Sequence, residues 1–164
     1  MRKKVILIIL GLLVIIQFIR PARNISTADS TNEISKHYMV PEDVKKIMQV
    51  SCNDCHTNNT NYPWYTNIQP VGWWMQWHVN QGKKHLNFEE FASYTPKKQH
   101  HKLEETEEQL KYGGMPLNSY LWIHKDAKLS PEQKDLLINW ATALKEKIAK
   151  ENNIVPENKE GASN

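Results

Sequence analysis

At 164 residues, the chain is long enough for one domain with extensions at its ends, on a scale of about 100–200 residues per domain. The formal net charge of +3 comes from the amino terminus, because residues 1–23 contain five basic residues and no acidic residue. The rest of the chain has 16 basic against 18 acidic residues, and this near-neutral balance argues against a nucleic-acid-binding protein.

The amino terminus joins the basic residues Arg2-Lys3-Lys4 to an apolar run from Val5 to Ile19. As a helix, this run is about 22 Å long, which is short for the roughly 30 Å hydrocarbon core of a bilayer and near the upper limit of a signal-peptide core. Arg20 and Arg23 follow at once, and the small-residue cleavage pattern Ser26-Thr27-Ala28 lies rather far downstream. We therefore favour an uncleaved signal-anchor over a removed signal peptide.

The basic start places the amino terminus of this segment, residues 1–23, in the cytoplasm and directs the rest of the chain outward. We expect a single pass of the inner, cytoplasmic membrane through residues 5–19, with the body of the protein on the periplasmic side. The alternative is a secreted periplasmic protein after cleavage of the signal.

The rest of the chain divides into a polar tether at residues 24–37, a body at 38–150 and a disordered polar tail at 151–164. Helices are expected at five places in the body: from Pro41, with Val44, Ile47 and Met48 buried; from Pro70 to Gly82; after Asn87; from Thr95-Pro96 to about Tyr112; and from Ser130-Pro131. Gly113-Gly114 and a Ser130–Gln133 capping box mark helix ends. No strand-like alternation occurs, so the fold class is predicted to be all-α.

Two helices differ in their surface pattern. The last helix has apolar residues at helical spacing, which are Leu137, Trp140, Ala141, Leu144 and Ile148. The helix before it has few apolar residues and a run of acids at Glu104, Glu105, Glu107 and Glu108. Such a run predicts a solvated face, with docking of a basic partner as the alternative.

The chain's two cysteines lie together in Cys52-Asn53-Asp54-Cys55-His56. Two thiols on one side of a tight turn can form thioethers to the edge of a haem, and the histidine after the second thiol can become the proximal iron ligand. Cys-x-x-Cys alone would also suit a thioredoxin-like redox pair, which expects strands, or half a zinc site, which needs further ligands. With the histidine, the export signal and the helical body, we predict one haem c, covalently bound through Cys52 and Cys55, with His56 on the iron.

The second axial ligand is expected to be Met115, in the sequence Gly113-Gly114-Met115-Pro116. A thioether is a soft, neutral ligand that stabilises ferrous iron. Glycines let the backbone approach the haem edge, and Pro116 stiffens the loop. A methionine packed in an ordinary turn is the structural alternative. His78 is the alternative distal ligand, although a histidine on a tryptophan-rich helix is more often a hydrogen-bonded structural group.

The haem motif, the later Met-Pro loop and the capped last helix together resemble the class I cytochrome c arrangement. More narrowly, the chain is similar to the haem-binding domain family over about residues 36–147, through Tyr62-Pro63-Trp64-Tyr65, Pro70-Val71-Gly72-Trp73-Trp74, His78-Val79 and Leu86-Asn87-Phe88. This resemblance implies a small cytochrome c-like helical domain wrapped around a covalently bound haem. It also implies attachment at Cys52 and Cys55, His56 as proximal ligand and Met115 as distal ligand.

These observations predict a membrane-anchored monohaem c-type cytochrome that passes single electrons to unidentified redox partner proteins. Two protein ligands would fill the iron, so we expect an electron carrier rather than a catalyst. One alternative is a haem peroxidase-like enzyme, or a gas or redox sensor, with a labile sixth ligand and His78 on the distal side. The other is a haem-free structural or thiol-redox module.

Overall fold

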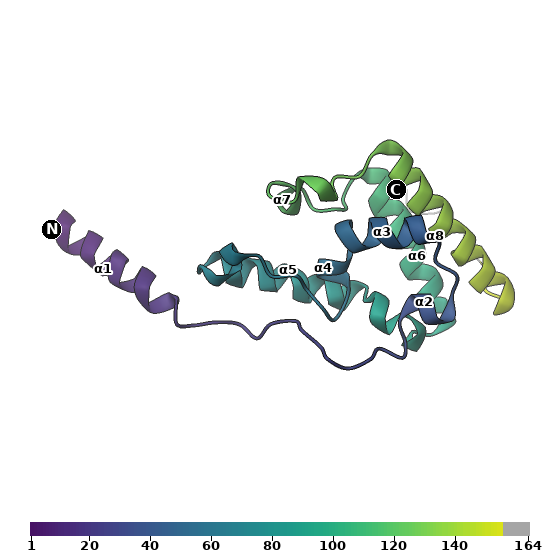
Figure 1. Ribbon diagram of the computed structural model, residues 1–164, viewed down its shortest axis with the longest axis horizontal. Coiled ribbons are helices and arrows are strands. Elements are labelled where there is room, and N and C mark those ends of the chain that lie inside the picture. The colour runs from purple at the N-terminus through teal and green to yellow at the C-terminus, as the bar shows by residue number, and fades with distance from the viewer. Residues whose placement is uncertain (156–164) are drawn as a thin grey trace, which may run out of the picture. The chain divides into compact units, whose positions relative to one another are not determined.

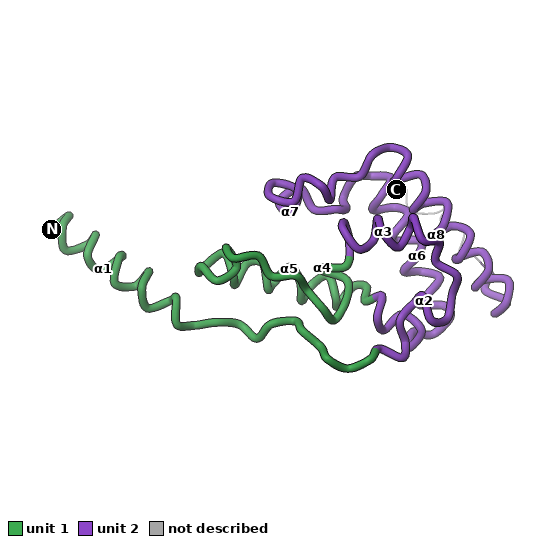
Figure 2. The backbone as a smooth tube through the Cα atoms, in the orientation of Figure 1, with its two compact units in different colours: residues 1–29, 53–87 green, residues 30–52, 88–164 purple. Residues whose placement is uncertain are grey.

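The computed structural model describes residues 1–155, and those residues form helices and connecting segments without a strand. The expected all-α class is confirmed. The chain divides into two units, shown in Figure 2: unit 1 comprises residues 1–29 and 53–87, and unit 2 comprises residues 30–52 together with the chain from Phe88 onward. The final part of the expected disordered tail, residues 156–164, lies outside the described residues.

Unit 1 contains α1 (Arg2–Ile16), α4 (Asn53–His56), the 3₁₀ helix η1 (Trp64–Asn67) and α5 (Val71–His85). Figure 1 labels the three α-helices. α5 packs against α4 and η1 through a face formed by Gly72, Gln76 and Val79. In α1 no side chain is buried. Within the described chain, no helix is both long and apolar enough to cross a membrane, and α1 has 15 residues.

The end of α5 corrects an expectation from the sequence, because the helix continues past Gly82 to His85. Gly82 does not end α5 but allows the helix to pack closely against the backbone of Cys55. A Cβ atom added at Gly82 would lie 2.6 Å from the carbonyl oxygen of Cys55, so only glycine lets the two backbones approach this closely. The helix closes when the N–H of Leu86 donates to the carbonyl oxygen of Gly82 at 2.9 Å.

Residues 17–26 of unit 1 follow α1 without forming a further helix, and we call them the amino-terminal strap. Its first residue, Gln17, donates from Nε2 to the carbonyl oxygen of Gln69 at 3.1 Å and accepts from the N–H of Gln69 at 2.8 Å. The indole N–H of Trp73 donates to the carbonyl oxygen of Ile19 at 2.7 Å. Asn24, the first residue of the expected tether, is 9 % exposed, and both the nitrogen and the oxygen of its side-chain amide form hydrogen bonds. The strap is therefore ordered by side-chain to backbone bonds.

Unit 2 contains α2 (Ile34–His37), α3 (Glu42–Ser51), η2 (Phe88–Ser93), α6 (Pro96–Tyr112), α7 (Asn118–Leu121), η3 (Lys125–Ala127) and α8 (Pro131–Glu151). The long helices α6 and α8 pack against each other, and α3 packs against α8. The core of this unit includes the fully buried side chains of Val44, Phe91, Leu103 and Ile148. Burying each such side chain stabilises the fold by about 1.5–3 kcal/mol.

The ends of the two long helices confirm the expected signals. The hydroxyl of Thr95 accepts from the N–H of Lys98 at the start of α6, and Gly113 ends that helix at φ +72°, in the left-handed region that favours glycine. Ser130 and Gln133 form the reciprocal capping box at the start of α8. The expected apolar positions of α8, from Leu137 to Ile148, are its buried face.

Glu107 does not lie on the solvated face that the acidic run predicted. It is buried in α6, and its carboxylate pairs with Lys145 of α8 at 2.6 Å and with Lys111 at 3.5 Å. The positions Gln99, Leu103, Glu107 and Leu110 share the buried face of α6. A carboxylate is tolerated there because a lysine from the neighbouring helix supplies its counter-charge.

Candidate functional site

The two cysteines lie on consecutive short elements. Cys52 caps the end of α3, where its N–H donates to the carbonyl oxygen of Met48 at 2.8 Å, and Cys55 lies in the single turn of α4. The boundary between the two units falls between Cys52 and Asn53. Within the described residues, both cysteines are partly exposed and neither forms a disulfide. The two cysteines are thus placed by the end of α3 and by the single helical turn of α4 that follows it.

The thiol of Cys55 is not poised for thiol-redox chemistry. Burial, and to a smaller extent the neighbouring carboxylate of Asp54, together raise its pKa to about 11. At neutral pH this side chain is therefore a protonated thiol, whereas reactive redox cysteines have lowered pKa values in electropositive surroundings. This environment, together with the lack of strands in the described chain, disfavours the thiol-redox alternative.

The ring of His56 is held in one orientation by the backbone that follows α5. Its Nδ1 lies 2.9 Å from the carbonyl oxygen of Leu86. A carbonyl oxygen can only accept, so Nδ1 carries the proton and Nε2 is the basic nitrogen. Burial lowers the pKa of His56, against the opposing effect of the carbonyls of Leu86 and Gly82. A neutral imidazole whose Nδ1–H is bound to a carbonyl is the usual state of a metal-ligating histidine.

The loop after the motif is tied to the amino-terminal strap through Asn24. The amide nitrogen of Asn24 donates to the carbonyl oxygen of Thr57 and to Oγ1 of Thr60, both at 2.9 Å. Lys83 of α5 donates to Oδ1 of Asn24 at 2.5 Å. Thr60 in turn donates to the carbonyl oxygen of Asp54, inside the motif, at 2.6 Å. Sequence reasoning missed Asn24, because its partners are 33 to 59 residues away and no local pattern indicates them.

His78, the alternative distal ligand, lies in α5 between two exposed tryptophans. Its Nδ1 is 2.9 Å from the carbonyl oxygen of Trp74, and its ring meets those of Trp74 and Trp77 edge-on at 4.5 and 4.8 Å. These contacts fix the ring within α5. The carbonyl oxygen of Trp74 can only accept, so Nδ1 of His78 donates this bond. Its role as a ligand stays a prediction.

Met115 is half-buried in the loop between α6 and α7, and its N–H lies 3.4 Å from the carbonyl oxygen of Gln109. Met115 belongs to unit 2, whereas Cys55 and His56 belong to unit 1. The pairing of Met115 with His56 on one iron therefore stays a prediction.

The helical fold and the Cys-x-x-Cys-His site define the class: a small all-α haem-binding protein. A family model described as a haem-binding domain matches residues 11–143, so the chain belongs to the haem-binding domain family. The family resemblance expected from the aromatic segments is confirmed. No curated protein and no solved structure matches the chain.

Proposed function

We propose that this haem-binding protein is a membrane-anchored monohaem c-type cytochrome that transfers single electrons on the periplasmic side of the inner membrane. The observation that carries the proposal is the bond between His56 and Leu86. It presents a neutral imidazole with its Nδ1 proton engaged and Nε2 as the basic nitrogen, beside two thiols at the spacing for thioether attachment. These donors fit a haem.

In this proposal, Cys52 and Cys55 hold one haem c through thioether bonds, His56 is the proximal ligand and Met115 the distal ligand. The haem supplies one-electron exchange when bound. The protein supports the site in two ways. Leu86 orients the imidazole through its carbonyl oxygen, and Gly82 lets α5 lie directly against the backbone of Cys55. Both features favour a rigid attachment site, which limits reorganisation on electron transfer.

The anchoring part of the proposal is supported by α1 and the residues just after it. The apolar side chains of α1 between Val5 and Ile15 are exposed, and Phe18 and Ile19 beyond the helix are 83 % and 58 % exposed. Exposed apolar side chains in one continuous run indicate contact with another apolar phase. Three basic residues and no acidic residue precede the run. This charge pattern favours an amino terminus in the cytoplasm and a haem domain in the periplasm.

A peroxidase-like enzyme or a gas or redox sensor is the second candidate. The observation that favours it is the fixed ring of His78, which lies in the same unit as His56. If the sixth position is labile, the reduced protein binds CO readily. A cytochrome with two strong protein ligands resists CO. Binding of CO to the reduced full-length protein therefore separates the two functions.

The test of haem attachment is to produce the full chain together with haem-attachment machinery and measure its mass and absorption spectrum. We expect the mass of the chain plus one haem, retained after denaturation, and a low-spin spectrum in both redox states. The variant Cys52→Ala/Cys55→Ala provides the control, because it keeps His56 and loses both thioethers. A bare chain mass for the exported wild-type protein would disprove the proposal.

A further inference from the structure

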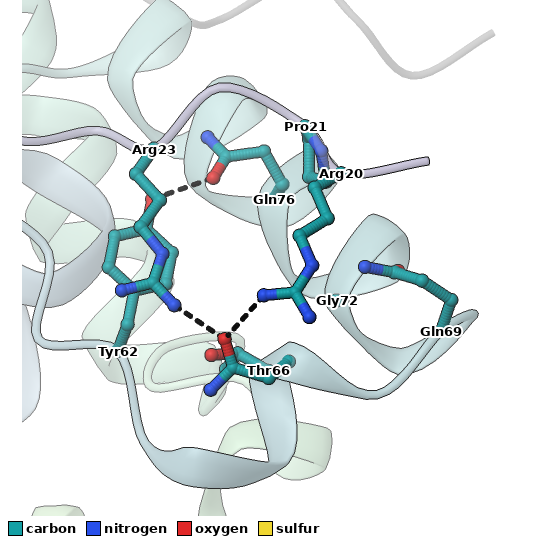
Figure 3. Close-up of a pocket in the computed structure, with 9 residues that line it drawn as sticks. Arg20, Pro21, Arg23, Tyr62, Thr66, Gln69, Gly72 and Gln76 are labelled. Carbon is teal, nitrogen blue, oxygen red and sulfur yellow. Dashed lines mark hydrogen bonds between the residues drawn. The ribbon is translucent and has the colours of Figure 1, made fainter. Parts of the chain in front are cut away.

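Two arginines of the amino-terminal strap converge on a single side chain of η1. Nη2 of Arg23 lies 2.7 Å and Nη1 of Arg20 lies 3.5 Å from Oδ1 of Asn67. Figure 3 labels the two arginines and draws a dashed line from each guanidinium group. The two positively charged guanidinium groups therefore lie close together at this oxygen. The acceptor that they share is a neutral amide, which hydrogen-bonds the guanidinium groups without cancelling their charge.

Among the residues that the structure describes, no carboxylate neutralises the charge of this pair. Within residues 1–155, neither Arg20 nor Arg23 forms an ion pair with a carboxylate, and residues 1–23 contain no acid. Each guanidinium has several N–H donors in a planar fork, and one of them is used by Asn67 in each case. The arginine pair, Arg20 and Arg23, therefore retains both positive charge and donors for an anion.

The position of Arg23 is set in advance by packing. Its guanidinium carbon lies 5.0 Å from the centre of the Tyr62 ring, a cation–π distance. The Tyr62 hydroxyl donates to Oε1 of Gln76 at 2.6 Å and accepts from the N–H of Asn24 at 2.7 Å, so two bonds hold the hydroxyl end of the ring. A cation held this way loses little conformational freedom when it binds an anion.

A small pocket opens between these groups. It has a volume of about 30 Å³ and is lined by Arg20, Arg23, Tyr62, Thr66 and Gln76, among others (Figure 3). Such a volume accommodates one water-sized group. A phosphate oxygen is a group of this size.

The arginine pair directly follows exposed apolar side chains. Phe18 and Ile19 precede Arg20, and the indole N–H of Trp73 binds the carbonyl oxygen of Ile19 at 2.7 Å. Tryptophan and arginine after an apolar run match the order of a bilayer, from hydrocarbon through the interface to the headgroups. Arginine also recognises phosphate through paired charge-assisted hydrogen bonds.

We propose that Arg20 and Arg23 form a phosphate-binding site for the headgroup of an anionic phospholipid. This inference rests on the proposed anchoring of residues 5–19, because anchoring brings the pair to the depth of the phosphates. An anionic glycerol headgroup is preferred to a zwitterionic choline headgroup, since choline adds a third positive charge beside two that no carboxylate of residues 1–155 pairs with.

The experiment uses the full, haem-loaded chain in nonionic detergent micelles and counts bound lipid by native mass spectrometry. Short-chain phosphatidylglycerol, short-chain phosphatidylcholine and inorganic phosphate are titrated separately. We expect phosphatidylglycerol to bind about tenfold more tightly than phosphatidylcholine, and Arg20→Gln/Arg23→Gln to remove that preference. The matched control is Lys45→Gln/Lys46→Gln, which removes the same charge from exposed positions of α3 and should leave the preference unchanged.

Equal affinity for the two lipids, or equal losses in the arginine and lysine variants, would overturn the proposal. Displacement of phosphatidylglycerol by an equimolar amount of inorganic phosphate would also overturn it, since free phosphate would then be the ligand. If the double variant does not accumulate, Asn67→Asp replaces it. That change keeps the shared acceptor while adding a carboxylate, and it should abolish the lipid preference.

Fractionation of the same cells tests the anchoring independently. The arginine variant keeps the apolar run and should remain in the membrane fraction with the wild type. A wild-type chain recovered in the soluble fraction would refute the anchoring, while the titration in micelles would still decide the phosphate site.

Discussion

Nδ1 of His56, at the end of α4, donates to the carbonyl oxygen of Leu86, the residue that follows α5, across 2.9 Å. The orientation of the imidazole thus depends on where α5 ends. That end lies beyond Gly82, whose lack of a side chain lets α5 pass against the backbone of Cys55. One glycine therefore serves both the close packing of the attachment turn and the position of the carbonyl that orients the proposed proximal ligand.

The first prediction concerns Gly82→Ala. By helix propensity alone, alanine would stabilise α5 by about 1 kcal/mol. The added Cβ would however lie 2.6 Å from the carbonyl oxygen of Cys55 and 3.0 Å from its Cβ, so α4 and α5 must separate. We expect a net loss of about 1–3 kcal/mol in the free energy of unfolding, with less haem bound per chain. Chemical denaturation and haem content measure these effects.

Gly11→Ala is the matched control, because it is also a glycine within a helix and nothing lies within 4 Å of its added Cβ. It should leave unit 1 as stable as the wild type. Equal or greater stability of Gly82→Ala would show that the contact with Cys55 does not limit the packing.

The second prediction separates the two candidates for the distal ligand. Met115→Ala should lower the reduction potential and open the reduced iron to CO, because loss of the thioether removes the ligand that favours ferrous iron. His78→Ala should leave the low-spin spectrum intact and change only the packing of Trp74 and Trp77. The far-red ferric band of a methionine-ligated haem is the measurement. Its persistence in Met115→Ala would exclude Met115, and its absence from the wild-type protein would favour the alternative function.

The third prediction tests the bond between the amino-terminal strap and the motif loop. Asn24→Ala removes the acceptor of Lys83 and the donor to Thr57 and Thr60, all within a buried site. We expect a loss of about 2 kcal/mol in the free energy of unfolding, because partners of a buried amide are left unsatisfied. Thermal unfolding of the full chain measures this loss.

Asn61→Ala, at an exposed position in the same loop, is the control and should change stability by less than about 0.5 kcal/mol. Asn24 and Asn61 variants of equal stability would mean that the strap does not support the loop.

The fourth prediction concerns the buried carboxylate of unit 2. Glu107→Gln leaves the ammonium group of Lys145, which is 19 % exposed, without its counter-charge. We expect the free energy of unfolding to fall by about 2 kcal/mol. In Glu105→Gln, partly exposed contacts with Lys102 and His101 are lost instead, and the change should stay within about 0.5 kcal/mol. Urea denaturation of both variants compares the two sites, and similar losses would contradict the special role assigned to Glu107.

Features that depend on neighbours in the sequence were predictable. The caps at Thr95 and Ser130 and the turn at Gly113 each involve residues within about one helical turn, so the amino-acid pattern contains all the groups that form them. The buried face of α8 followed from apolar spacing for the same reason. The Cys-x-x-Cys-His motif and the family to which the chain belongs were likewise evident from contiguous residues.

Features that depend on distant partners were not predictable in this way. Glu107 has the sequence surroundings of a solvated glutamate, and only the packing of α6 on α8 brings Lys145 to it. Gly82 has the pattern of a helix terminator, yet it lies inside α5, where it packs closely against the backbone of Cys55. Asn24 stands in a polar segment without periodicity, yet its partners are Thr57, Thr60 and Lys83.

By itself, the amino-acid sequence determined the all-α class, most of the helix ends and the Cys-x-x-Cys-His motif, because short-range backbone and side-chain interactions or contiguous residues decide these features. The tertiary structure alone decided the tautomer of His56, the continuation of α5 past Gly82, and the convergence of Arg20 and Arg23 on Asn67. Each of these needs groups that are far apart along the chain to meet in space. A hydrogen bond at about 3 Å between such groups is set by packing, which no local pattern encodes.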